Sequence, residues 1–329
     1  MRILSAADVR KALPIPAAIE AMRQAFASLS AGRVIMPQRI HMDIRRHRGI
    51  SLLMPAYIDD VGGEALALKV VSLFPNNAAH GLAMLQAVVL AFDPYTGRPV
   101  ALMEGAALTA IRTAAACGLA AEILARPESK VVAIFGAGVQ ARAQLQAMCC
   151  VRPIETAWIY DPIPGRAETF ISELAGLDGI CADLRPAAGP AEALAEADIV
   201  CTATTAMNPV FEDADLRKGT HINAIGSYQP HVSEIPPQTV ARALVIVDSR
   251  QAALDEAGDL IQPINAGLID AGHIHAELGE LVLGHKHGRR SAKQITLFKS
   301  VGVAVQEAAA ARAAMMAAEQ ADLGTVVPW

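Results

Sequence analysis

Three basic side chains have the type and setting needed to hold an anionic substrate. Lys69 lies in the apolar run 65–71, and burying its ammonium is costly unless the group is paired or its pKa is shifted. Arg112 is a single arginine in the small, apolar segment 108–116, where a guanidinium can hold a carboxylate through two parallel hydrogen bonds. Arg39 is a weaker candidate of the same kind. Together they would suit an anionic substrate beside a cofactor, while structural ion pairs remain the alternative for each of them.

A glycine turn at residues 136–141 follows the apolar run 131–135 and opens a predicted helix. Its spacing is Gly-x-Gly-x-x-Ala: the first glycine permits a tight turn, the second lets the backbone approach a pyrophosphate, and the small last residue lets helix and strand pack closely. The helix N-terminus offers free N–H groups and a positive dipole end to the phosphates. The predicted contacts to the dinucleotide come from Gly136, Ala137, Gly138, Val139 and Gln140.

The next predicted strand ends at Asp161, about where an acidic residue of such folds bonds the ribose hydroxyls of NAD. Arg166 lies nearby and can instead meet the 2′-phosphate of NADP. The sequence therefore predicts NAD(P)H as cofactor and leaves open the choice between NADH and NADPH. A solvated strand end is the alternative for Asp161.

A threonine cluster follows a later predicted strand, 198–203. Ligands bind outside the carboxyl ends of parallel strands, so Thr202 and Thr204 are expected to line the cofactor crevice. Threonines that only cap a turn are an equal alternative.

The elements that must position these residues change in type near residue 127. Before it, the sequence predicts one helix, short strands, a hairpin turn and an alanine-rich helix, at 5–30, 51–54, 65–72, 85–92, 93–97 and 108–124. After it, strands alternate with helices, which implies crossovers and a parallel sheet. The alanine-rich helix predicted at 303–322 can return to pack on the first segment.

This pattern predicts an α/β fold of two domains. A Rossmann-type parallel-sheet domain is expected at residues 119–304, for the dinucleotide. A discontinuous α+β domain for substrate binding and dimerisation is expected from residues 1–118 and 305–329.

Composition narrows the class of protein. Apolar residues make up 53% of the chain and charged residues 19%, which is typical of a packed protein rather than a disordered one. A net charge of −5 gives no broad basic field for nucleic acid. We find no apolar run of roughly 18 residues and no signal-peptide pattern, so no membrane association is expected. The cysteines are odd in number and the histidines lack metal-ligand spacing, which predicts buried free thiols, no metal site and a cytoplasmic location.

In combination, these motifs resemble the ornithine cyclodeaminase and mu-crystallin family. The resemblance covers nearly the whole chain, although no single motif would be specific. It rests on the glycine turn and on the segments 69–77, 93–99, 108–115, 223–227 and 296–302.

The resemblance implies a homodimer whose N-terminal substrate and dimerisation domain is completed by the C-terminal helix. By position, Arg39 and Arg112 match the arginines that hold the substrate carboxylate. Lys69 matches the lysine beside the carbon that gains or loses hydride, over the nicotinamide ring. The resemblance also implies cofactor contacts from Ser227, Ser300 and Val301.

One departure bears on the activity. The cyclodeaminases carry an aspartate shortly after the Asn-Ala-x-Gly turn, whereas here no acid follows Gly226 until Glu234. In this segment the sequence is similar to the imine reductases that act on Δ1-pyrroline-2-carboxylate and Δ1-piperideine-2-carboxylate. The resemblance therefore implies reduction of a cyclic ketimine carboxylate to L-proline or L-pipecolate, and argues against ornithine cyclodeamination.

Two other functions stay open. One is another enzyme of the same family, an alanine dehydrogenase or an ornithine cyclodeaminase. The other is a non-catalytic protein that binds a small ligand with NADPH, as mu-crystallin-like members do. Intact Lys69 and Arg112 favour retained chemistry over a binding role.

Overall fold

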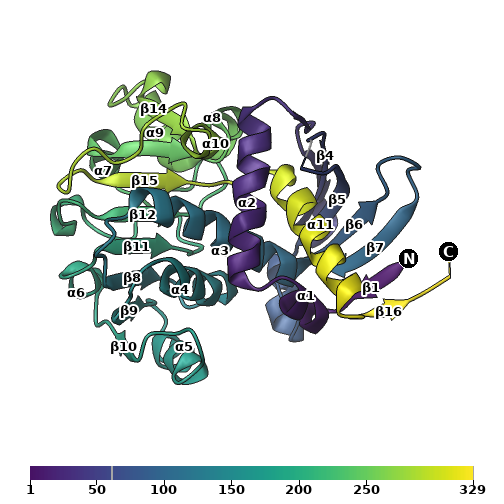
Figure 1. Ribbon diagram of the computed structural model, residues 1–329. Helices are drawn as coiled ribbons and strands as arrows, with labels where there is room; N and C mark the ends of the chain where they lie inside the picture. Colours follow the sequence, from purple (N-terminus) through teal and green to yellow (C-terminus); the bar gives the residue numbers. More distant parts are fainter. Residues whose placement is uncertain (61, 329) are drawn as a thin grey trace. The chain divides into compact units, whose positions relative to one another are not determined.

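The computed structural model describes residues 1–60 and 62–328, which divide into two compact units. Unit 1 comprises residues 1–112 and 303–329, and unit 2 comprises residues 113–302. Each unit is built on its own eight-stranded sheet (Figure 1). The predicted fold class, a parallel-sheet α/β domain with a discontinuous α+β domain, is confirmed. The functional assignment of the two predicted domains stays a prediction.

The sheet of unit 1 is mainly antiparallel, with one parallel pair between β1 and β7. In spatial order its strands are β16 (Thr325–Val326), β1 (Arg2–Leu4), β7 (Pro99–Glu104), β6 (Leu85–Phe92), β5 (Ala65–Leu73), β4 (Gly49–Ile58) and β2 (Val34–Ile35), with β3 (Ile40–Ile44) also on β4. Its helices are α1 (Ala6–Ala12), η1 (Arg45–His47), η2 (Pro75–His80) and α11 (Ala304–Gln320), with α2 (Ile15–Ser30) and the start of α3 (Gly105–Leu124).

The two faces of this sheet differ in burial. Helix α11 packs against β4, β5 and β6 and against α2. Along β5, Ala67, Lys69 and Val71 are buried, whereas Leu68 and Val70 between them are only half-buried. Because successive side chains of a strand point to opposite faces, Lys69 lies on the helix-covered face and a second apolar face remains partly open.

The helix predicted over residues 5–30 is in fact two helices, so that prediction was wrong. Helix α1 begins after Ser5, whose side chain caps it in a reciprocal pair with Asp8, and ends at Ala12. Helix α2 begins after Pro14. The break has a plain cause: proline has no N–H to continue the hydrogen-bond ladder, and its ring clashes with the preceding turn.

The sheet of unit 2 is parallel throughout. In spatial order its strands are β10 (Asp183–Pro186), β9 (Thr156–Tyr160), β8 (Val131–Phe135), β11 (Ile199–Thr202), β12 (His221–Ala224), β15 (Thr296–Lys299), β13 (Leu244–Val247) and β14 (Ile274–Glu277). Its helices are α4 (Val139–Val151), α5 (Arg166–Leu174), α6 (Pro190–Leu194), η3 (Asp213–Asp215), α7 (Pro237–Arg242), α8 (Arg250–Glu256), α9 (Gly258–Asn265), η4 (Ala271–His273) and α10 (Leu278–Val282), with the remainder of α3.

The strand order of unit 2 fixes where a ligand would bind. From β8 the chain passes outward to β9 and β10, then returns to β11 on the other side of β8. In open parallel sheets such a reversal leaves a crevice at the carboxyl ends of the two strands, and ligands bind there. The crevice expected here lies beyond Phe135 and Thr202, the last residues of β8 and β11.

Helix α3 passes a length-and-composition test for a membrane span, which our sequence analysis did not foresee. Among the described residues it is the single helix to do so, and 89% of its apolar window is buried inside the protein. Buried core helices pass the same test, so this is weak support for a membrane span.

All five cysteines are free thiols. Cys117, Cys181 and Cys201 are buried as predicted, but Cys149 is half-buried and Cys150 is exposed. The prediction was wrong for the adjacent pair because both residues lie near the C-terminal end of α4, on the side of the helix that is not fully covered.

Candidate functional site

A cavity of about 450 Å³ lies at the expected crevice of unit 2. The residues that line it follow the ends of β8, β9 and β11. Predicted cofactor residues among them are Gly136, Ala137, Gly138, Asp161, Arg166 and Thr204. The structure therefore brings the glycine turn, the acidic strand end and one threonine to the same cavity.

The two glycines of the turn are required for different reasons. Gly136 has φ +93°, and a Cβ there would lie 2.7 Å from the carbonyl oxygen of Ala203. Gly138 precedes the first residue of α4, and a Cβ there would meet no protein atom within 4 Å. Gly136 is thus required by the fold itself, whereas the open space at Gly138 would let a pyrophosphate lie close to the protein backbone.

Gly138→Ala should therefore weaken dinucleotide binding by about tenfold or more without lowering the melting temperature. The added Cβ would fill the space that the pyrophosphate needs, and it would contact no protein atom. Gly136→Ala should lower both the dinucleotide affinity and the melting temperature, because alanine is strained in a left-handed backbone conformation and its Cβ would clash with Ala203. Titration of NADH fluorescence and a thermal melt measure the two effects. Gly62→Ala in unit 1, which has open space around its Cβ, serves as control. Unchanged NADH affinity in the Gly138 variant would contradict this assignment.

Asp161 is fixed beside the glycine turn. Its Oδ2 accepts the Ala137 N–H at 2.9 Å and its Oδ1 accepts the Ile163 N–H at 3.0 Å. Its side chain is 7% exposed, whereas that of Arg166 is 58% exposed, with Nη1 3.9 Å from Asp161 Oδ2. The carboxylate is thus held rigidly, while the guanidinium is largely in solvent.

The other predicted cofactor residues do not line this cavity. Val139 and Gln140 begin α4. Ser227 is buried and its hydroxyl donates to the Val232 carbonyl oxygen at 2.7 Å. The Ser300 hydroxyl and the Val301 N–H both donate to Asp248, at 2.7 and 2.9 Å. Cofactor contacts from these residues stay a prediction.

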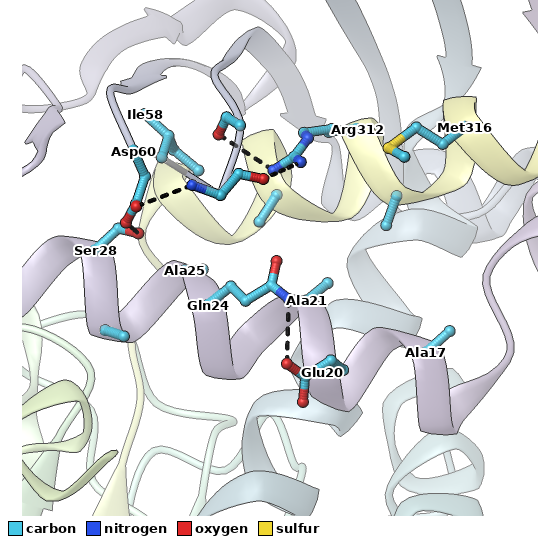
Figure 2. A pocket seen from close by; sticks show the side chains of 15 residues that line it. Ala17, Glu20, Ala21, Gln24, Ala25, Ser28, Ile58, Asp60, Arg312 and Met316 are labelled. Atoms are coloured by element: carbon cyan, nitrogen blue, oxygen red, sulfur yellow. Dashed lines mark hydrogen bonds between the residues drawn. The ribbon is translucent and has the colours of Figure 1, made fainter. Parts of the chain in front are cut away.

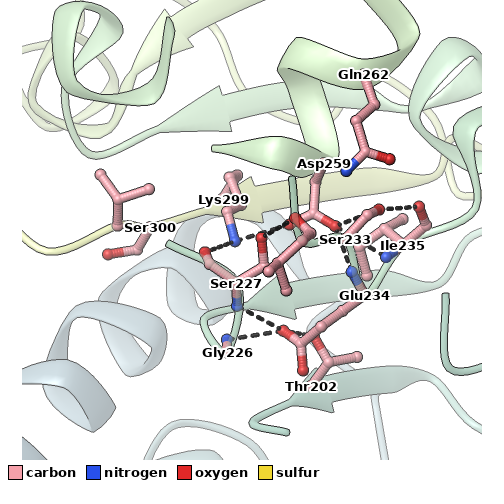
Figure 3. Close-up of polar contacts among 12 residues, drawn as sticks. Thr202, Gly226, Ser227, Ser233, Glu234, Ile235, Asp259, Gln262, Lys299 and Ser300 are labelled. Carbon is pink, nitrogen blue, oxygen red and sulfur yellow. Dashed lines mark hydrogen bonds and ion pairs between the residues drawn. The ribbon is translucent and has the colours of Figure 1, made fainter. Parts of the chain in front are cut away.

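A buried glutamate that sequence reasoning did not assign ties together the ends of β11 and β12 (Figure 3). Glu234 accepts the Thr202 hydroxyl at 2.9 Å, and the hydroxyl and N–H of Thr204 at 2.7 and 2.8 Å. It also accepts the Gly226 N–H at 2.7 Å. The predicted threonines therefore shape the cavity wall through Glu234, and Thr202 itself is fully buried.

A buried ion pair supports the same loops. Lys299 Nζ lies 2.8 Å from Asp259 Oδ2 and donates to the Ser227 carbonyl oxygen. Asp259 Oδ1 accepts the N–H groups of Glu234 and Ile235 at 2.6 and 2.9 Å. Burial raises the pKa of Glu234, partly offset by the charge of Lys299. At Asp259 burial acts in the same direction, but the charge of Lys299 and the hydrogen bonds from Lys299, Ile235 and Glu234 together outweigh burial and lower the pKa. The sequence offered one signal for this ion pair: Lys299 is a single charge in the apolar strand 296–299, just as Lys69 is a single charge in its strand.

In unit 1, Lys69 and Arg112 meet on one carboxylate that sequence reasoning also missed. Lys69 Nζ lies 2.5 Å and Arg112 Nε 2.7 Å from Glu307 Oε1. Arg112 Nη1 donates to Gln306 Oε1 at 2.8 Å. The side chains of Lys69, Arg112 and Glu307 are 3%, 7% and 0% exposed, and we call these three residues the unit 1 ion cluster.

The electrostatics of this cluster suit a group that exchanges a proton near neutral pH. Burial lowers the pKa of Lys69 to about 8, with Glu307 opposing the shift and the charges of Arg112 and Arg39 adding to it. Burial would raise the pKa of Glu307, but Arg112 and Lys69 outweigh burial and lower it. Glu307 therefore stays ionised while Lys69 can both hold and release a proton. Arg39 is half-buried just before β3.

The signal that could have revealed Glu307 resembles the one that revealed Arg112. Gln306 and Glu307 are an adjacent polar pair near the start of the alanine-rich α11, and both are fully buried. A charge on such a helix needs a partner. The partners lie far back in the sequence, on β5 and α3.

Unit 1 also contains a groove of about 480 Å³ between α2, α11 and the loop after β4 (Figure 2). Alanine is the most frequent residue in its walls. Arg312 donates to the carbonyl oxygens of Gly62 and Gly63 at one side, and Asp60 accepts the Ser28 hydroxyl at 2.6 Å. Among the residues that line it, none was predicted to carry function.

Comparison with known proteins places these features in context. The model of the ornithine cyclodeaminase/mu-crystallin family matches residues 1–321. A Δ1-pyrroline-2-carboxylate reductase of Bacillus cereus is 40% identical over 309 residues, which cover 93% of each chain. The resemblance drawn from the motifs is thereby confirmed.

Two solved structures are similar over nearly their whole length. One is the Δ1-pyrroline-2-carboxylate reductase of Thermococcus litoralis in complex with NADH and L-proline, with a TM-score of 0.95, 44% identity, and coverage of 99% of this chain and 100% of that one. The other is an archaeal alanine dehydrogenase dimer with bound NAD, with a TM-score of 0.90, 32% identity, and coverage of 100% and 99%.

Proposed function

The chain belongs to the ornithine cyclodeaminase/mu-crystallin family, and on that premise we propose that it reduces a cyclic ketimine carboxylate with a nicotinamide cofactor. The substrates proposed are Δ1-pyrroline-2-carboxylate and Δ1-piperideine-2-carboxylate, and the products L-proline and L-pipecolate. The observation that carries the proposal is the buried unit 1 ion cluster, in which Lys69 has a pKa of about 8 beside the guanidinium of Arg112. The similarity to reductases of this substrate class supports it.

The residues of unit 1 bind and activate the substrate in this proposal. Arg112 and Arg39 hold the carboxylate, which fixes the orientation of the C=N bond. A protonated imine has the more electron-poor carbon and accepts hydride more readily. Lys69 supplies or holds that proton, directly or through water, because its pKa lies close to the working pH. Glu307 keeps Lys69 and Arg112 in place through its Oε1 atom.

The residues of unit 2 fit a dinucleotide. The open space at Gly138, the tight turn at Gly136 and the start of α4 would hold the pyrophosphate, and Asp161 would hold the adenosine ribose. When bound, the nicotinamide cofactor supplies the hydride.

A steady-state screen tests the proposal. Five- and six-membered cyclic imine carboxylates are each offered with NADH and with NADPH, beside pyruvate plus ammonia. We expect cofactor oxidation with a cyclic imine at a kcat/KM well above that for pyruvate plus ammonia. The reverse order would indicate an alanine dehydrogenase, and cofactor binding with no turnover of any substrate would indicate a binding protein.

We further infer a preference for NADH over NADPH. The carboxylate of Asp161 is nearly buried and held by two backbone N–H groups, so a 2′-phosphate would face a fixed negative charge. Asp161→Asn should lower the NADH-to-NADPH ratio of kcat/KM by about tenfold, and the largely exposed Arg166→Gln should change it far less. A wild-type enzyme that favours NADPH would contradict the inference.

We also infer that the chain forms a homodimer through the open face of the unit 1 sheet. Leu53, Val70 and Val88 are neighbours across β4, β5 and β6 on that face, and all three are half-buried. Beside them on β3, Ile40 and Met42 are 59% and 51% exposed. An apolar sheet face of this extent needs a cover, and a second copy provides one. The dimeric alanine dehydrogenase of the same fold supports this choice.

Val70→Glu should therefore convert the dimer to a monomer, because two carboxylates would be buried at the interface without partners. Sedimentation equilibrium measures the mass of each species. Glu319→Gln on the exposed end of α11 is the control and should stay dimeric. A wild-type chain that sediments as a monomer at micromolar concentration would refute the inferred dimer.

A further inference from the structure

The unit 1 ion cluster has a charge imbalance that bears on what it can bind. Lys69 and Arg112 both contact Glu307, and the charge of Arg39 acts on Lys69 and Glu307, so three cations act on one carboxylate. Such a site suits a substrate carboxylate. A protonated imine nitrogen carries a positive charge, however, and three cations would repel it unless it faces the carboxylate.

One atom of the cluster and one atom of the neighbouring Gln306 are buried, have no hydrogen-bond partner among the described residues, and are in no ion pair given above. They are Glu307 Oε2 and Gln306 Nε2. Both side chains are held in a fixed orientation: Glu307 Oε1 by Lys69 and Arg112, and Gln306 Oε1 by the Val303 N–H at 2.9 Å and by Arg112. Leaving a buried polar atom without a hydrogen bond is costly, so an acceptor on Glu307 and a donor on Gln306, both in fully buried side chains that contact Arg112, point to a ligand.

We propose that Glu307 Oε2 accepts the N–H of the protonated ring nitrogen, and that Gln306 Nε2 donates to a carboxylate oxygen of the same substrate. This assignment rests on the proposed function and adds the recognition of nitrogen to it. Glu307 is then a catalytic residue, because it touches the reacting group. It selects a cyclic substrate that carries N–H over one of equal shape that does not.

The reduction step balances without proton transfer to or from Glu307, which stays ionised throughout. Hydride adds to the imine carbon, the π pair of the C=N bond moves onto nitrogen, and the positive charge of the nitrogen is cancelled. The N–H bond is present before and after the step. Glu307 therefore stabilises the cationic form that reacts and keeps a hydrogen bond to the neutral amine that results.

The test uses two planar inhibitors that differ at one atom. Pyrrole-2-carboxylate presents a ring N–H, and furan-2-carboxylate presents a ring oxygen in the same place. For the full-length wild-type enzyme we expect pyrrole-2-carboxylate to inhibit imine reduction with an inhibition constant at least about tenfold lower than that of furan-2-carboxylate. A difference of this size is typical of a hydrogen bond to a charged group. Equal inhibition constants would overturn the proposal, even if no variant could be purified.

Variants then assign the preference to one atom. In Glu307→Gln the amide oxygen must serve Lys69 and Arg112, so the NH₂ group takes the place of Oε2 and a donor replaces the acceptor. The ratio of the two inhibition constants should fall to about one or invert. Gln306→Met should weaken both inhibitors alike and keep the ratio, and Glu319→Gln on the same helix should change neither constant. A Glu307→Gln enzyme that keeps the wild-type ratio would overturn the assignment.

Failure of this inference can be distinguished from failure of the proposed function. If wild-type enzyme reduces cyclic imines but does not discriminate between the two inhibitors, the function stands and the role of Glu307 Oε2 is wrong. If no cyclic imine is reduced, the proposed function fails first. Direct calorimetric binding of both inhibitors then still reports on the nitrogen preference of the site.

Discussion

Lys69→Met should lower kcat for cyclic imine reduction by about 10²–10⁴-fold and leave NADH binding unchanged. The lysine is buried on the helix-covered face of the unit 1 sheet, and its ammonium is the one group of the ion cluster with a pKa near the working pH. Methionine fills the same volume without the proton, and Arg112 still neutralises Glu307. Stopped-flow reduction and an NADH titration separate the two quantities.

The matched control for this prediction is Lys130→Met. Lys130 lies on the surface of unit 2 with its side chain 53% exposed, paired with Glu155 at 2.6 Å. Removing this surface pair should change neither kcat nor NADH affinity. Near-normal turnover by Lys69→Met would rule out Lys69 as the residue that manages the proton.

The pH profile gives the same prediction a second readout. A protonated Lys69 is required, and its pKa is lowered to about 8, so kcat/KM should be level below that pH and fall about tenfold per unit above it. Raising the pH deprotonates the lysine, which fixes the sign of the change. In Lys69→Met this alkaline limb should vanish, and its persistence would assign it to another group.

Arg112→Met should lower kcat/KM by roughly 30-fold to 10³-fold, mostly through KM, and should also lower the melting temperature. Arg112 contacts Glu307 and Gln306 with two of its donors and has further N–H groups for a substrate carboxylate. Lys69 still compensates the charge of Glu307 in this variant, but Glu307 and Gln306 each lose a buried donor, which costs about 1–3 kcal/mol and lowers the melting temperature. Steady-state kinetics over a range of imine concentration gives the division between KM and kcat.

Arg112→Lys refines this test, because lysine keeps the charge and loses the planar fork. It should restore much of the melting temperature and little of the substrate affinity. Arg98→Met, in the exposed turn between β6 and β7, is the control and should resemble wild type. If Arg112→Met kept its KM, the carboxylate would have to be held elsewhere.

The local signals in the sequence were sufficient for the central elements. The run 131–135 and the strand 85–92 appear in the structure with the predicted bounds, because apolar strands bounded by turn residues are specified locally. The glycine turn lies where its spacing predicts, because Gly136 has a positive φ and glycine is the residue that adopts this conformation readily. Isolated charges in apolar segments singled out Lys69 and Arg112, and both are buried.

What the sequence did not reveal depends on contacts between distant segments. Glu307 follows Lys69 by 238 positions, and no local pattern joins them. The sequence analysis mentioned Glu234 only as the first acid after Gly226, too far along to match the aspartate of the cyclodeaminases. Its hydrogen-bond partners come from the ends of two different strands, which no local pattern shows. The two-residue strands β2 and β16 are too short to carry a periodic signal. Pro14 did carry a local signal for the break between α1 and α2, and our prediction of one continuous helix ignored it.

The most direct test of the account follows the hydride itself. NADH carrying deuterium at both hydrogen positions of nicotinamide C4 is mixed with Δ1-pyrroline-2-carboxylate and wild-type enzyme, and the product is analysed by mass spectrometry and NMR. We predict L-proline in an amount equal to the NADH consumed, with deuterium at its Cα. Proline without deuterium at that carbon, or NADH consumed without proline, would contradict the claim that this chain transfers hydride to the carbon of a cyclic imine.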